Sequence, residues 1–90
     1  MDDNQKNSGI NPSATVHDAI SALSGMIAAH PDDSDLYYQR GRLHWRTGEH
    51  AAAITDYEHA VALNPESPAR QTLEIARSVM DFFNPDLLNP

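Results

Sequence analysis

Apolar residues recur every three or four positions along most of the chain, which is the period of an α-helix. The pattern is interrupted three times by proline, glycine or asparagine, at 30–33, 47–49 and 64–67. Four helices are therefore expected, over residues 14–29, 34–47, 50–63 and 68–83. Since no segment alternates apolar and polar residues with the period of two that a half-buried strand requires, the chain is predicted to be all-α.

The interruptions contain residues that typically begin or end helices. Asp33 can cap the second helix, because its carboxylate can accept a hydrogen bond from a backbone N–H group of the first turn. Gly48 follows the same helix and can adopt the left-handed conformation that often ends a helix. Ser67 followed by Pro68 is a start signal for the fourth helix.

The chain repeats its own pattern at an offset of 34 residues, which is typical of a helical repeat. The apolar positions of the first helix, and the proline that follows it, return in the third. The matching pairs are Ala19 with Ala53, Ile20 with Ile54, Leu23 with Tyr57, Met26 with Ala60, Ile27 with Val61 and Pro31 with Pro65. The caps Asp33 and Ser67 have the same offset, so the second and fourth helices are in register as well.

The segment from Ser34 to Ser67 resembles the tetratricopeptide repeat, a helix–turn–helix unit of this length. The positions that carry the resemblance are Tyr37, Gly41, Gly48, Ala53, Tyr57, Ala60 and Pro65. The glycine and alanines where the helices cross would let them approach closely, and the two tyrosines would fill the space around them. His44 and His50 depart from the pattern, because aromatic residues usually occupy their positions.

The resemblance implies a right-handed solenoid of stacked helix–turn–helix units. One unit cannot bury its apolar face alone, so neighbouring helices must stack on it. The first helix resembles the second half of a repeat and would cover one side, while the fourth helix would cap the other. We expect a single helical domain over 13–90, preceded by a flexible N-terminal tail over 1–12, which is polar and has no period.

The composition argues against several classes of function. With 13 acidic and 6 basic residues and a net charge of −7, the chain repels nucleic acids and anionic membranes at long range. Cysteine is absent, and no two of the five histidines have the i,i+4 spacing of paired metal ligands on a helix. Without a phosphate loop or a nucleophile motif, we expect no enzymatic activity, cofactor or metal. A signal peptide and a membrane-length apolar run are also missing, so a cytoplasmic location is expected.

Candidate binding residues lie on the helix predicted over 34–47. By the resemblance, this helix lines the concave groove of the solenoid, with Tyr38, Arg42 and Trp45 facing the groove and Arg46 at its edge. Arginine and aromatic residues are enriched at binding hot spots, and arginine can hold a carboxylate through two N–H groups. The hypothesis is a protein partner that binds through an acidic or C-terminal peptide. In the alternative, the arginines are solvated or paired within the chain, and Trp45 packs against the fourth helix.

Arg40 lies on the same helix but is expected to have a structural role. By the resemblance, its position faces the third helix, where Asp56 stands. We expect an ion pair between the two side chains within the chain.

The fourth helix and the residues after it carry a second apolar set. The face that carries Leu73 is expected to pack on the repeat, whereas Ile75, Val79 and Phe82 lie on a different side and remain partly exposed. The candidate self-association residues are Val79, Phe82, Phe83, Leu87 and Leu88. Two outcomes are open. Either the last residues fold back over this patch, or the patch forms a homodimer, which is the alternative function.

Overall fold

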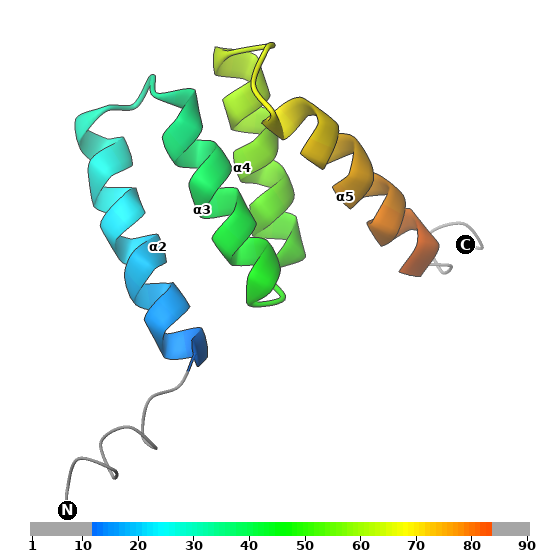
Figure 1. Cartoon of the computed structure of the whole chain (residues 1–90), viewed down its shortest axis with the longest axis horizontal. Helices are drawn as coiled ribbons and strands as arrows, with labels where there is room; N and C mark the ends of the chain where they lie inside the picture. The colour runs from blue at the N-terminus through cyan, green and yellow to red at the C-terminus, as the bar shows by residue number, and fades with distance from the viewer. Residues whose placement is uncertain (1–11, 84–90) are drawn as a thin grey trace, which may run out of the picture.

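The computed structural model describes residues 12–83, and the side chains from residue 15 to residue 82. It contains four α-helices in this range and no strand (Figure 1). The helices are α2 (Pro12–Ala29), α3 (Ser34–Arg46), α4 (His50–Leu63) and α5 (Ala69–Phe83). The all-α prediction is therefore confirmed for the described residues. The predicted tail before Pro12, residues Leu87 and Leu88, and the side chain of Phe83 lie outside them.

The predicted helix boundaries are correct to within two residues. The first helix begins at Pro12, two residues before its predicted start at residue 14. Proline suits the first turn, because the N–H group that it lacks would have no partner inside the helix there. The second helix ends at Arg46 and the fourth begins at Ala69, each one residue short of the prediction, as is common at helix ends.

The predicted caps of α3 and α5 are both present. The carboxylate of Asp33 accepts a hydrogen bond from the backbone N–H of Asp35 at 3.1 Å. The hydroxyl of Ser67 accepts one from the backbone N–H of Ala69 at 3.0 Å. Each side chain satisfies a donor that the first helical turn leaves without a partner.

The turn between α3 and α4 depends on Gly48. This residue has a φ of +83°, the left-handed conformation that favours glycine. Its N–H group donates to the carbonyl of Trp45 at 3.1 Å, and the next N–H group, of Glu49, donates to the carbonyl of His44 at 2.9 Å. These two bonds form a Schellman motif, which ends α3 and allows α4 to start at once.

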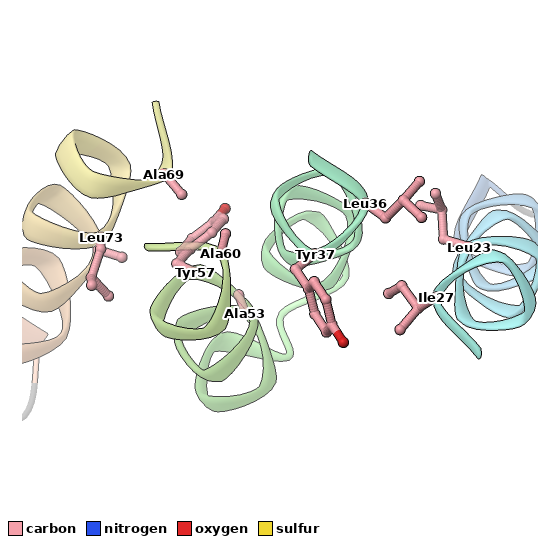
Figure 2. Close-up of a cluster of buried hydrophobic side chains, with 10 residues drawn as sticks. Leu23, Ile27, Leu36, Tyr37, Ala53, Tyr57, Ala60, Ala69 and Leu73 are labelled. Atoms are coloured by element: carbon pink, nitrogen blue, oxygen red, sulfur yellow. The ribbon is translucent and has the colours of Figure 1, made fainter. Parts of the chain in front are cut away.

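The four helices lie in a row in which each helix packs on the next (Figure 1). The most extensive contact joins α3 and α4. The buried apolar residues are Leu23, Ile27, Leu36, Tyr37, Ala53, Tyr57, Ala60, Ala69, Leu73 and Ala76. Figure 2 shows side chains from α2 directed toward α3, and side chains of α5 on the side of that helix that faces α4. The core therefore continues along the row from one helix pair to the next.

Helices α3 and α4 approach each other closely at Gly41. A Cβ atom at this position would lie 2.7 Å from Cε1 of Tyr57 and 3.1 Å from the carbonyl oxygen of Ala53. The first distance is too short for a real Cβ atom and the second is unusually tight, so any larger residue here would force Tyr57 or α4 to shift. Ala53 and Ala60 are fully buried on the facing side of α4, and Tyr57 fills the space beside them (Figure 2). The predicted role of these small residues is confirmed.

Tyr37 connects the turn before α3 with helix α4. Its hydroxyl donates a hydrogen bond to the carbonyl of Pro31 at 3.0 Å. Its ring stacks on His59 of α4 with a centroid separation of 4.0 Å. The side chain therefore holds the turn that ends α2 in place against α3 and α4.

Candidate functional site

Four side chains of α3 form the candidate site that the sequence indicates. Their spacing places Tyr38, Arg42, Trp45 and Arg46 on one side of the helix, one or two turns apart. Both arginines are exposed, whereas both aromatic residues are half-buried. The arginines can therefore reach a partner directly, and the aromatic residues are already held by packing.

Arg42 and Tyr38 contact each other on this surface. The guanidinium carbon of Arg42 lies 5.8 Å from the centre of the Tyr38 ring, within the range of a cation–π contact. The Tyr38 ring lies 6.0 Å from the ring of Tyr57, and its hydroxyl is 3.4 Å from that of Thr72 on α5. Tyr38 is thus fixed between three helices, and it restricts the positions that Arg42 can adopt.

The two arginines line a pocket between α2 and α3. The pocket has a volume of about 250 Å³. Its lining residues are Leu23, Gln39, Arg42, Leu43 and Arg46. Leucines from both helices thus form its apolar part, and three polar side chains of α3 supply hydrogen-bond donors.

Trp45 faces a different pocket, between α3 and α5. This one has a volume of about 140 Å³ and is mostly apolar. It is lined by Trp45, Tyr57, Thr72, Ile75, Ala76 and Val79. The indole ring also lies 4.1 Å from the ring of His50 at the start of α4. Trp45 therefore combines two roles, because it packs within the fold and lines an open pocket.

The structure divides the predicted set instead of gathering it in one groove. Arg42 and Arg46 belong to the pocket beside α2, and Trp45 belongs to the pocket beside α5. Sequence analysis did not identify Leu23 or Gln39 as lining residues. The spacing of Gln39 and Arg42 places them on one helix face, which could have indicated Gln39 as a lining residue. The contribution of Leu23 depends on how α2 lies against α3.

Arg40 and Asp56 form the predicted ion pair. The guanidinium group donates two hydrogen bonds to the carboxylate, both of 2.8 Å, and a third of 2.9 Å to the hydroxyl of Ser24 on α2. Asp56 is only 4% exposed, so its charge depends on this partner. Hydrogen bonding to Asp56 raises the pKa of Arg40 above its ordinary value. The pair connects α2, α3 and α4 and takes no part in the exposed surface.

The exposed arginines differ in whether they have a partner. Among the described residues, no carboxylate lies within ion-pair distance of Arg42 or Arg46. Arg77, on α5, donates a hydrogen bond to Glu58 on α4. Two arginines one turn apart on α3 therefore lack a carboxylate partner within the part of the chain that the structure describes.

Glu49, in the turn after α3, accepts hydrogen bonds from several elements. Nδ1 of His44 lies 2.7 Å from one carboxylate oxygen, and Nε2 of His17, on α2, lies 3.4 Å from the other. The hydroxyl of Thr47 donates to the same carboxylate at 3.1 Å. The hydrogen bond from His44, with smaller contributions from Thr47 and His17, lowers the pKa of Glu49. His44 therefore contacts Glu49, and His50 contacts the ring of Trp45. Both histidines make specific contacts at the positions where they depart from the repeat pattern.

Two features of other kinds of site are absent from the described residues. Between residues 12 and 83, no three histidine or acidic side chains lie close enough together to share a metal ion. Within the same range, none of the helices has both the length and the apolar character that crossing a membrane requires.

A family model described as tetratricopeptide repeat matches residues 34–67. The sequence analysis assigned the repeat to the same residues, and they contain the whole of α3 and α4. No curated protein and no solved structure matches the chain. The match agrees with the geometry, since the close crossing at Gly41 and the buried alanines of α4 both lie inside it.

Proposed function

Because the chain carries a tetratricopeptide repeat over residues 34–67, a protein-interaction unit, we propose that it binds a partner protein through the exposed face of α3. The proposed ligand is an acidic segment of the partner with an aliphatic side chain beside its carboxylates. The acidic residues would bind Arg42 and Arg46, and the aliphatic side chain would enter the pocket between α2 and α3. In this proposal the chain contributes binding and no catalysis.

The observation that carries the proposal is the pair of unpaired arginines. The chain has more than twice as many acidic as basic residues, so an arginine has many potential partners within it. Arg40 and Arg77 have such partners in Asp56 and Glu58. Arg42 and Arg46 have none among the described residues, although they are one helical turn apart. Two adjacent guanidinium groups can hold carboxylates through paired N–H groups.

The surroundings of the two arginines support the same ligand. Leu23 and Leu43 give the pocket an apolar lining on which an aliphatic side chain could pack. The contact with Tyr38 restricts Arg42 before any ligand arrives, which reduces the entropy that binding would cost. Since the whole chain is negative, the attraction to an acidic segment is local to the two arginines.

Binding of short labelled peptides tests this proposal. The probe is a mixture of eight-residue peptides with four Asp or Glu residues around one Leu, measured by fluorescence anisotropy against a mixture with Lys in place of the acids. The wild type should prefer the acidic mixture. The double variant Arg42→Gln and Arg46→Gln should lose at least tenfold in affinity, whereas Arg70→Gln should not, since this exposed arginine lies outside the pocket. Equal binding of both mixtures, or equal losses in both variants, would overturn the proposal.

A second candidate function is self-association through α5. It is favoured by Ile75 and Phe82, large apolar side chains that are 58% and 77% exposed. Such residues on one helix face are typical of a contact with another protein surface. Sedimentation over a range of concentrations tests it. An increase of apparent mass toward that of a dimer supports this function, and a constant monomer mass at millimolar concentration excludes it.

A further inference from the structure

Arg42 and Arg46 border the same pocket, and one negative group can contact both of them. They are four residues apart on α3, which is about 6 Å along the helix axis, so their side chains lie on one face of the helix. Both side chains are exposed, and both line the pocket between α2 and α3. Two guanidinium groups at this spacing can therefore converge on a single ligand group placed between them.

The lining of this pocket contains two positive side chains and no negative one. Its other residues are Leu23, Gln39 and Leu43. Among the described residues, neither arginine has a carboxylate within ion-pair distance. The amide group of Gln39 donates a hydrogen bond to the carboxylate of Asp35, which lies seven residues, or about 10 Å along the helix axis, before Arg42. A ligand between the two arginines therefore meets both positive charges and lies away from Asp35.

A carboxylate and a phosphate monoester differ in how well they match this pair of arginines. A carboxylate carries one negative charge, and its two oxygens can both be occupied by the parallel N–H groups of one arginine. A phosphate monoester carries a charge of about −1.5 to −2 near pH 7 and has three acceptor oxygens. One phosphate can therefore neutralise Arg42 and Arg46 together and accept hydrogen bonds from each, whereas one carboxylate leaves a second arginine without a partner.

We infer that the acidic group bound by this surface is the phosphate of a phosphorylated serine or threonine in the partner protein. This inference rests on the binding through α3 proposed above and names the group that is recognised. The phosphate lies between Arg42 and Arg46, and a neighbouring aliphatic side chain of the same segment packs on Leu23 and Leu43 in the pocket. Clusters of arginine are a recurring means by which proteins recognise phosphorylated segments.

Other sources of phosphate fit this site less well. Nucleic acids and anionic membranes present many negative charges, so the net charge of −7 opposes their approach at long range. A phosphorylated side chain concentrates its charge in one group, which the two arginines can neutralise locally. Free phosphate makes no use of Leu23 and Leu43, which form the apolar part of the pocket. A phosphorylated protein segment is the ligand that uses both parts.

Three labelled peptides that differ at one position test this inference. Each has eight residues, with phosphothreonine, threonine or glutamate two positions before a leucine and no other acidic residue, and binding is measured by fluorescence anisotropy at pH 7.5. The phosphothreonine peptide should bind at least tenfold more tightly than the glutamate peptide. A glutamate peptide that binds as tightly would overturn the inference, although binding of acidic segments would stand. If none of the three binds, the inference is overturned, and the acidic mixture described above decides separately whether the proposed function stands.

The second ionisation of the phosphate provides an independent measurement. Its pKa is about 6, whereas the pKa of a glutamate side chain is about 4.3. Lowering the pH from 7.5 to 5.5 therefore removes charge from the phosphothreonine peptide and leaves the glutamate peptide ionised. The ratio of the two affinities should fall at least threefold, and this ratio cancels the titration of the protein's own histidines, which acts on both peptides. A ratio that stays constant would contradict recognition of a doubly charged phosphate.

Substitutions of the arginines test whether both contact the phosphate. Arg42→Gln and Arg46→Gln should each reduce the preference for phosphothreonine over glutamate, and the double variant should abolish it. Arg70→Gln is the control, because Arg70 is an exposed arginine outside this pocket, and it should retain the preference. A preference that survives in the double variant, or one that Arg70→Gln reduces equally, would overturn the assignment of the phosphate to this pair.

Competition with inorganic phosphate distinguishes a protein segment from free phosphate as the ligand. Inorganic phosphate should displace the phosphothreonine peptide only at concentrations at least tenfold above the dissociation constant of the peptide, because it lacks the aliphatic side chain that packs on Leu23 and Leu43. Displacement at a concentration equal to that constant would make free phosphate the ligand and overturn the assignment to a protein segment.

Discussion

The substitution Gly41→Ala tests the packing on which the repeat depends. The new Cβ atom would lie 2.7 Å from Cε1 and 2.8 Å from Cδ1 of Tyr57, and 3.1 Å from the carbonyl oxygen of Ala53. The oxygen belongs to the backbone of α4 and cannot turn aside. The Tyr57 ring is 2% exposed and lies against Tyr38, so it has little room to move. Either the ring or the whole of α4 must shift.

The expected change in the free energy of unfolding combines two opposing contributions. Forcing an extra methyl group into a packed core typically costs about 1–3 kcal/mol. Replacing glycine by alanine inside a helix gains about 0.5–1 kcal/mol, because alanine loses less conformational freedom on folding. With both contributions taken at the middle of their ranges, the net effect for Gly41→Ala is a destabilisation of about 1 kcal/mol, which lowers the Tm of a domain of this size by about 4–8 °C.

Gly25 provides a matched control within the same chain. It also lies inside a helix, but a Cβ atom there would meet nothing within 4 Å. Gly25→Ala should therefore retain only the favourable contribution and stabilise the domain by about 0.5–1 kcal/mol. Both variants are measured by urea and thermal unfolding, followed by circular dichroism at 222 nm, together with the wild type.

The difference in stability between Gly41→Ala and Gly25→Ala tests whether α3 and α4 cross closely at Gly41. If Gly41→Ala is as stable as Gly25→Ala, the close crossing of α3 and α4 is refuted. A second substitution identifies the clashing group. Tyr57→Leu removes the ring, so the double variant with Gly41→Ala should lose less stability than the sum of the two single losses. Strict additivity would mean that the ring of Tyr57 is not what the new methyl group meets.

Three further predictions concern the charged and titrating groups. Asp56→Ala leaves Arg40 without its carboxylate partner and should lower the free energy of unfolding, measured in urea, by about 2–3 kcal/mol. This is less than the roughly 3–5 kcal/mol lost when a fully buried pair is broken, because Arg40 is partly exposed. The pKa of Glu49 is lowered, chiefly by His44, so its contribution to stability is present above its unfolded pKa of about 4.3 and is lost as pH falls through the lower folded value. Glu49→Gln should therefore reduce the dependence of Tm on pH between pH 5 and pH 3. A dependence as steep as that of the wild type would contradict this prediction. Burial raises the pKa of Tyr57, so the stability that its neutral form provides is lost as pH rises through that higher value. Absorbance at 295 nm should show a late ionisation step that Tyr57→Phe removes, and a persisting step would contradict the assignment.

The sequence was sufficient for features that depend on local geometry or on the repeat. The caps at Asp33 and Ser67 need only a side-chain oxygen within two residues of a free N–H group. The turn at Gly48 needs only a residue that tolerates positive φ. The pairing of Arg40 with Asp56 followed from the repeat register, because that register fixes which faces of two neighbouring helices meet.

Features that depend on the angles between helices could not be predicted from the sequence. Arg42 and Trp45 are three residues apart on one side of α3, yet they line different pockets, since α2 and α5 approach the helix from different directions. The place of Leu23 in the first pocket and of Thr72 in the second depends on the same crossing geometry. That geometry results from side-chain packing along the whole contact and not from any short segment. The partner of Arg77 was missed for the same reason.

The most direct test of the account is to map where an acidic peptide binds. Backbone amide shifts of the isotope-labelled chain are followed by NMR while the acidic peptide mixture is added. We predict the largest shifts in residues 39–46 of α3 and around Leu23 of α2, and none around Glu58 on α4. Largest shifts at Glu58, or no shift at residues 39–46 when the anisotropy reports binding, would contradict the assignment of the α3 face as the binding surface.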